Sequence, residues 1–159
     1  MAQFPQLQQE DIDQLNIVLG ELLTKSEATT ALLVEKAGYL IHQCGNPTQV
    51  DTTTFATLGS NAYNAVQLMA SLVNENNFTS MYQQGENFST LMLNVEENSL
   101  LVIIFPTNLT VGSIKYYAAP AAKLLADRIT LASARAPQRL DLSDLNATDV
   151  PALFRRSST

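Results

Sequence analysis

The spacing of hydrophobic residues along the chain changes several times between a helical period and a strand pattern. Residues 10–25 begin with acidic side chains, which the positive end of a helix dipole favours, and continue with leucines three or four positions apart. The apolar residues that share this face are Ile12, Leu15, Leu19, Leu22 and Leu23. The pattern predicts a first amphipathic helix.

Two short runs rich in β-forming residues follow, at 30–35 and 39–44. Between them stands Lys36-Ala37-Gly38, whose glycine can supply the positive φ that a tight hairpin turn needs. The two runs predict an antiparallel pair of strands.

Residues 52–73 carry a second, sustained helical pattern. Asp51 and Thr52 are favourable capping residues at its start. The apolar residues that repeat every three or four positions behind them are Phe55, Leu58, Ala62, Val66, Met69 and Val73. The repeat predicts a second helix, and we expect Phe55 and Val66 to point to the sheet.

A meander of three strands is predicted beyond this helix. The runs are rich in β-forming residues, are separated by polar turns, and lie at 79–84, 87–95 and 99–105. The strand at the start of this meander has neither proline nor lysine over 80–84 to guard an edge, so it is a plausible pairing strand.

Residues 111–135 predict a third helix with one irregular position. Its apolar face consists of Ile114, Tyr117, Ala121, Leu124, Leu125 and Ile129. Pro120 lies inside this pattern, where it would remove a backbone hydrogen bond and clash with the preceding turn, at a cost of ~3 kcal/mol in a regular helix. We therefore expect a kink or a new helix start at Pro120.

The predicted order of elements is αββαβββα, which indicates an α+β fold with a five-stranded antiparallel sheet and helices on both faces. Three regions are expected along the chain. Residues 1–9 are an N-terminal extension, 10–136 form one domain, and 137–159 form a polar C-terminal tail whose leucines are too sparse for a core.

Composition and charge narrow the classes of function. Apolar residues make up 46% of the 159 residues and charged residues 15%, which is typical of a compact globule and not of a disordered chain. Positions 1–114 hold eleven acidic and two basic residues, whereas 115–159 hold four and seven. Because an acidic body repels phosphate backbones and anionic lipids, we expect a protein partner and no nucleic acid.

The sequence also bears on the compartment. Its longest purely apolar stretch, 100–106, is far shorter than the ~20 residues of a membrane span, so no membrane insertion is expected. The first residues lack the basic start and apolar run of a signal peptide. The single cysteine, Cys44, fits a reducing compartment. We expect a cytoplasmic protein.

Few residues have the chemistry of a catalytic site. His42 and Cys44 are two positions apart on one predicted strand, so their side chains point to the same face. Two interpretations are open: a Cys/His nucleophile pair, or a hydrogen-bonded imidazole beside a buried thiol. Glu96 and Glu97 lie in a predicted turn and are typical of a solvated hairpin end. The glycine motifs that cradle phosphates and dinucleotides are missing. We predict no catalytic residue, no cofactor and no metal site, and therefore no enzyme.

Two local sequences resemble one known family. The first hairpin of the roadblock and dynein light-chain family, a strand, a glycine-ended turn and a second strand, is similar to Leu32-Leu33-Val34-Glu35-Lys36-Ala37-Gly38-Tyr39-Leu40-Ile41. The last helix of that family, with its leading glycine, is similar to Val111-Gly112-Ser113-Ile114-Lys115 and the helix that follows. The resemblance covers roughly 10–135 and implies a roadblock/profilin-like fold, although Pro120 departs from the family's usually unbroken last helix.

Membership of this family implies a homodimer whose second helices pack together and whose third strands pair into one continuous sheet. The residues allow this independently, because apolar positions spread further round the second helix than one sheet covers, unless the helix simply has a wide core face. The residues predicted at the dimer interface are Ala56, Gly59, Tyr63, Ala65, Leu68, Ala70, Leu72, Met81 and Tyr82.

Similarity to the bacterial gliding-motility regulators of this family implies a function. The homodimer would act as an adaptor that binds a Ras-like small GTPase in its GTP-bound form. It would promote GTP hydrolysis by ordering the partner's own catalytic loop, without an arginine finger. The alternative is a non-enzymatic scaffold or a small-ligand sensor, and a sensor should present a polar-lined pocket.

Overall fold

The computed structural model describes residues 4–46 and 50–135. In chain order its elements are α1 (Gln9–Ser26), β1 (Thr30–Glu35), β2 (Leu40–Gly45), α2 (Thr52–Ala70), the 3-10 turn η2 (Ser71–Val73), β3 (Ser80–Gln84), β4 (Phe88–Glu96), β5 (Ser99–Pro106) and α3 (Val111–Ala134). Each begins and ends within a residue of the predicted bounds, except that the second helix continues as η2. The predicted tail at 137–159 lies outside the described residues.

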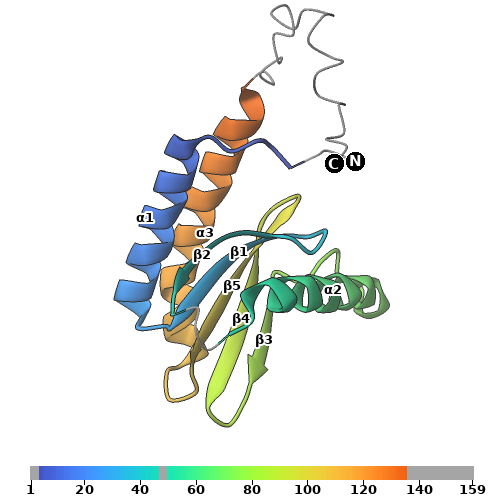
Figure 1. Cartoon of the computed structure of the whole chain (residues 1–159). Coiled ribbons are helices and arrows are strands. Elements are labelled where there is room, and N and C mark those ends of the chain that lie inside the picture. Colours follow the sequence, from blue (N-terminus) through green and yellow to red (C-terminus); the bar gives the residue numbers. More distant parts are fainter. Residues whose placement is uncertain (1–3, 47–49, 136–159) are drawn as a thin grey trace, which may run out of the picture.

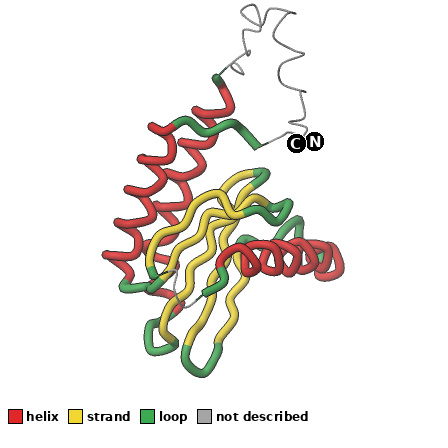
Figure 2. The backbone as a smooth tube through the Cα atoms, in the orientation of Figure 1, coloured by secondary structure: helices red, strands yellow, loops and turns green. Residues whose placement is uncertain are grey.

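The five strands form one antiparallel sheet in the order β2-β1-β5-β4-β3. Helices α1 and α3 lie side by side on one face, and α2 lies on the other (Figure 1). Figure 2 shows the strands between these two helical layers. The predicted element order and the α+β fold with helices on both faces are confirmed.

The turn between β1 and β2 has the predicted geometry. Gly38 has φ +109°, a region that L side chains rarely adopt, and its N–H donates to the Glu35 carbonyl at 2.8 Å. The glycine therefore closes the hairpin as expected.

The larger core lies between the sheet and the α1–α3 layer. Alternate residues of the central strand β5 point into it, while Leu100 and Val102 point to the other face, so β5 is buried on both sides. This is why the strand is continuously apolar in sequence. The buried residues on this side are Leu15, Leu19, Leu22, Ala28, Ala31, Leu33, Leu91, Leu101, Ile103, Phe105, Ile114, Ala118, Ala121, Leu125 and Ile129.

Helix α2 turns a different side to the sheet from the one that its apolar repeat predicted. Leu58 and Met69 are exposed, while Phe55 packs against the core as expected. A Cβ added at Gly59 would lie 3.0 Å from Met92 Cε, so the small residues of the helix bring it close to the sheet. The buried residues of α2 are Thr52, Ala56, Gly59, Ser60, Tyr63 and Ala70.

Helix α3 is continuous through Pro120, so of the two predicted outcomes, a kink or a new start, the new start is wrong. The proline deprives the Tyr116 carbonyl of its usual partner within the helix. Both residues lie on the exposed side of α3, where water can take that place. The opposite side of the helix is buried through Ile114, Ala118 and Leu125, and this packing outweighs the local penalty.

Candidate functional site

The outer face of α2 and η2 is uncharged and exposes several large apolar side chains. No charged residue occurs between positions 52 and 73. The large apolar side chains that protrude there are Leu58 (63% exposed), Leu68 (79%), Met69 (56%), Leu72 (80%) and Val73 (60%). Ala62 and Ala65 are exposed between them. We call these seven residues the α2 stripe. Apolar side chains gathered in this way on a protein surface mark an interaction site.

Strand β3 provides a second interaction feature beside the helix. Within the described part of the chain it pairs only with β4, so its outer edge is open. Met81 packs against the core under α2, and Tyr82 stacks on Phe105 at the other face with ring centroids 6.3 Å apart. An unguarded edge of this kind can pair with a strand of another molecule.

The structure places the nine predicted interface residues in three settings. Four are buried within the chain itself: Ala56, Gly59, Tyr63 and Ala70. Three lie on the outer face of α2 and η2: Ala65, Leu68 and Leu72. The last two, Met81 and Tyr82, lie on the edge strand.

The four buried residues cannot serve as a contact surface. The Tyr63 hydroxyl, for example, donates to the Phe78 carbonyl at 3.2 Å and ties the helix to the start of β3. The predicted interface lacks the remaining four members of the α2 stripe, because their helical repeat is equally suited to covering a sheet: Leu58, Ala62, Met69 and Val73.

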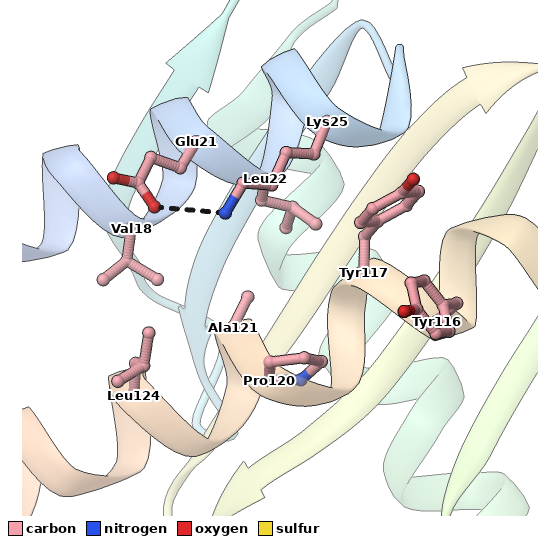
Figure 3. A pocket seen from close by; sticks show the side chains of 9 residues that line it. All are labelled: Val18, Glu21, Leu22, Lys25, Tyr116, Tyr117, Pro120, Ala121 and Leu124. Carbon is pink, nitrogen blue, oxygen red and sulfur yellow. Dashed lines mark ion pairs between the residues drawn. The ribbon is translucent and has the colours of Figure 1, made fainter.

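A groove of about 450 Å³ lies between α1 and α3 (Figure 3). At one end the rings of Tyr116 and Tyr117 meet edge to face, with centroids 5.1 Å apart, and at its rim Lys25 pairs with Glu21 at 3.6 Å. Most of the lining is apolar, which suits an aliphatic side chain better than the polar ligand of a sensor. The lining residues are Val18, Glu21, Leu22, Lys25, Tyr116, Tyr117, Pro120, Ala121 and Leu124.

A buried carboxylate joins the start of α1 to the end of α3. Asp11 accepts from the Gln8 N–H at 2.8 Å, forms an ion pair with Arg128 Nε at 3.3 Å, and accepts a hydrogen bond from Arg135. Arg128 also pairs with Glu10 at 3.1 Å. The Arg135 hydrogen bond lowers the pKa of Asp11 from its ordinary value, against the raising effect of burial. Both arginines are thus engaged in structural ion pairs.

His42 and Cys44, the candidate nucleophile pair, make contacts that are typical of structural residues. His42 Nε2 lies 3.3 Å from Asn16 Oδ1 on α1, and burial lowers the pKa of this histidine. Cys44 is half-buried and packs against the larger core. This arrangement matches a hydrogen-bonded imidazole beside a covered thiol.

The acidic turn between β4 and β5 has a structural role. Glu96 closes the β4–β5 hairpin by accepting from the Asn98 N–H at 3.1 Å and from the Ser99 hydroxyl at 2.6 Å. In the described ranges, no cluster of three or more histidine, cysteine or acidic residues could hold a metal ion. Of the helices over these same residues, none has the length and apolar character needed to cross a membrane.

Several solved structures are similar to this fold. Myxococcus xanthus MglB is 26% identical, covers 83% of this chain and 98% of its own, and has a TM-score of 0.74. The gliding protein MglB of Thermus thermophilus is 25% identical over 82% of this chain and 99% of its own, with a TM-score of 0.76. A structure described as MglB with tetrameric arrangement is 27% identical over 83% and 99%, with a TM-score of 0.77.

No curated protein sequence matches the chain, but a family profile does. The profile of the Roadblock/LC7 domain matches residues 14–105, which is more than half of the chain. This match and the similarity to three MglB structures show that the chain belongs to the Roadblock/LC7 family and resembles its MglB branch.

Proposed function

We propose that this chain is a cytoplasmic, homodimeric regulator of a Ras-like small GTPase and carries out no chemistry of its own. The observation that carries the proposal is the α2 stripe beside the open edge of β3, on a fold similar to that of MglB. A monomer would leave both features exposed to water.

The proposed dimer uses these two features together. Two copies related by a two-fold axis bury their α2 stripes against each other, and their β3 edges pair into one continuous sheet. Such an interface is self-complementary, since each stripe meets its own copy. The proposed contact residues are Leu58, Ala62, Ala65, Leu68, Met69, Leu72, Val73, Met81 and Tyr82.

The partner is inferred from the relatives. The similar structure from Thermus thermophilus is a gliding protein by name, and the resemblance of the chain to the gliding-motility regulators points to a Ras-like GTPase. The γ-phosphate orders the switch loops of such GTPases, so a regulator that contacts these loops distinguishes the GTP form from the GDP form.

Stimulated hydrolysis would rely on the residues of the GTPase. Arg128 and Arg135, the arginines among the described residues, have side chains only 18% and 34% exposed and are held by Asp11. Extending either one into a partner's active site would leave the buried carboxylate of Asp11 without part of its compensation. We therefore favour a mechanism in which the chain positions the partner's own catalytic loop over one in which it inserts an arginine.

The test begins with a pull-down from native lysate with GTP added and identification of any small P-loop protein that is retained. The purified GTPase is then loaded with GDP or with a non-hydrolysable GTP analogue and titrated by calorimetry. We expect at least about tenfold tighter binding to the GTP form, which corresponds to ~1.4 kcal/mol. The protein alone should neither bind nor hydrolyse GTP. Equal affinity for both forms would reduce the function to that of a passive platform.

Single-turnover hydrolysis separates the two possible mechanisms. Replacing Lys115, Arg128 or Arg135 singly by alanine should weaken binding modestly at most and should leave the stimulation in place. The thermal stability of each variant is measured in parallel, because two of these residues form structural ion pairs. Complete loss of stimulation from one substitution, with binding intact, would establish an arginine or lysine finger instead.

A further inference from the structure

A second groove, of about 420 Å³, lies between α3 and the first strands of the meander. It is on the sheet face opposite to α2, so it does not overlap the α2 stripe, and its Ser80 belongs to β3, whose outer edge pairs in the proposed dimer. We call it the lysine groove. Its lining residues are Thr79, Ser80, Leu93, Asn94, Val95, Lys115, Ala119, Ala122 and Lys123.

The lysine groove differs in charge from the rest of the chain. Two lysines and no carboxylate line it, although the protein has a net charge of −6. Lys115 forms no ion pair or hydrogen bond within the described residues, and Lys123 reaches only Asp127, at 3.9 Å with both side chains mostly exposed. Asp127 therefore offsets part of the charge of Lys123, whereas Lys115 has no acidic partner within the described residues. The groove keeps a net positive charge.

The other cations of the described chain are engaged elsewhere. Lys25 pairs with Glu21, and Arg128 and Arg135 pair with Asp11. Lys36 donates to Asn94 Oδ1 at 2.6 Å and to the Glu96 carbonyl. Within the described residues, Lys115 is thus the cation without an ion pair or hydrogen bond, and Lys123 lines the same groove.

The spacing of the two lysines sets the geometry of a ligand. Lys123 follows Lys115 by eight positions on α3, which corresponds to ~12 Å along the helix axis. Between the two lysines, Ala119 and Ala122 line the α3 side of the groove, and their small side chains leave room for a ligand. In an extended peptide, side chains four residues apart lie on the same side at ~13 Å, which matches the separation of the lysines.

The floor of the groove matches the same kind of ligand. Leu93 and Val95 are half-buried and offer apolar surface, and Ser80 and Thr79 add hydroxyl groups at the edge. A segment whose carboxylates reach the lysines would place the residue midway between them over this apolar floor. We infer that the lysine groove binds an extended acidic segment of a partner protein, with two carboxylates four residues apart.

The probe is the labelled peptide Gly-Ser-Glu-Thr-Val-Thr-Glu-Ser-Gly, with a matched peptide in which both glutamates are glutamine. Chemical-shift mapping on the full chain should locate the glutamate peptide at residues 79–80, 93–95 and 115–123. The glutamine peptide should bind about tenfold more weakly, as expected for two exposed charge pairs, and high salt should remove the difference. Shifts confined to other surfaces, or equal affinity of the two peptides, would refute the inference.

A double variant tests the lysines themselves. Lys115→Gln with Lys123→Gln should weaken binding of the glutamate peptide by about tenfold. Lys25→Gln is the matched control, because it removes an exposed lysine from α1 outside the groove and should leave the affinity unchanged. Unchanged affinity in the double variant would overturn the assignment. An oligonucleotide of the same charge that competes equally well would show general anion binding and would also overturn it.

Discussion

The two faces of the sheet are covered in different ways. On one face, α1 and α3 enclose a core of leucine, isoleucine and phenylalanine side chains. On the other face a single helix covers a smaller core, mostly with small residues together with the rings of Phe55 and Tyr63. The leucines and Met69 of α2 point outward.

The two faces therefore differ in how much of their apolar surface is buried within one chain. The α1–α3 face buries most of its large apolar groups within one chain, and the Asp11 ion pairs close the end where α1 begins and α3 ends. The α2 face has an uncharged outer surface with many exposed apolar side chains that a second layer would cover. Substitutions on the two faces should therefore affect different equilibria.

The largest effect on folding is expected on the α1–α3 face. Leu125→Ala should lower the free energy of unfolding by ~2–5 kcal/mol, because it leaves a cavity in the larger core. Leu72→Ala is the matched truncation on the α2 face, at a residue 80% exposed, and should cost below ~0.5 kcal/mol for the monomer. Urea unfolding at low protein concentration measures both. Similar losses would show that the two faces contribute alike to the fold.

The next effect concerns association. Leu68→Asp together with Leu72→Asp should give a folded monomer, because two carboxylates would have to be buried in the proposed interface. Each substitution should weaken the dimer by at least about tenfold, or ~1.4 kcal/mol. Analytical ultracentrifugation at micromolar concentration measures the change.

The control for this experiment lies on the other face. Leu131→Asp places the same charge at an exposed leucine of α3 and should leave the dimer intact. If the unmodified protein is already a monomer at this concentration, the proposed geometry of the dimer does not apply.

A smaller effect is expected where α2 touches the sheet. Gly59→Val should destabilise the fold by ~1–3 kcal/mol, because its Cβ would lie 3.0 Å from Met92 Cε and two more carbons would follow. Ala62→Val adds a β-branched residue to the exposed side of the same helix and controls for helix propensity. Equal thermal shifts in the two variants would mean that the close contact is unimportant.

Much of the fold could be predicted because local signals sufficed. The helical repeats, the polar turns of the meander and the positive φ of Gly38 each depend on neighbouring residues. The orientation of α2 cannot be predicted from neighbouring residues in the same way. Its sequence offers one face with Leu58 and Met69 and another with Ala56 and Gly59, and hydrophobicity alone favours the first. The structure buries the second, because close approach to Met92 requires small residues.

The candidate sites depend on contacts that no local pattern encodes. The lysine groove joins Ser80 and Leu93 to Lys115, residues from separate elements that the sheet topology brings together. Arg135 reaches Asp11 across a separation of 124 residues. Net charge indicated an acidic protein, but only the fold shows that Lys115 has no ion pair or hydrogen bond among the described residues.

The smallest effect should appear as a dependence of stability on pH at the closed end of the α1–α3 face. The pKa of Asp11 is lowered in the folded chain, chiefly by the hydrogen bond from Arg135, relative to ~3.9 in an unfolded chain. Its contribution is therefore fully present above the unfolded pKa and is lost as the pH falls through the folded value. The stability difference between the unmodified protein and Asp11→Asn should be constant from about pH 7 to 5 and should shrink below about pH 4. Asp13→Asn removes one carboxylate from the same helix, leaves the Asp11 ion pairs in place, and is the matched control. Urea unfolding across this pH range measures both variants, and a difference for Asp11→Asn that is unchanged at acid pH would show that the ionised carboxylate does not stabilise this end of the fold.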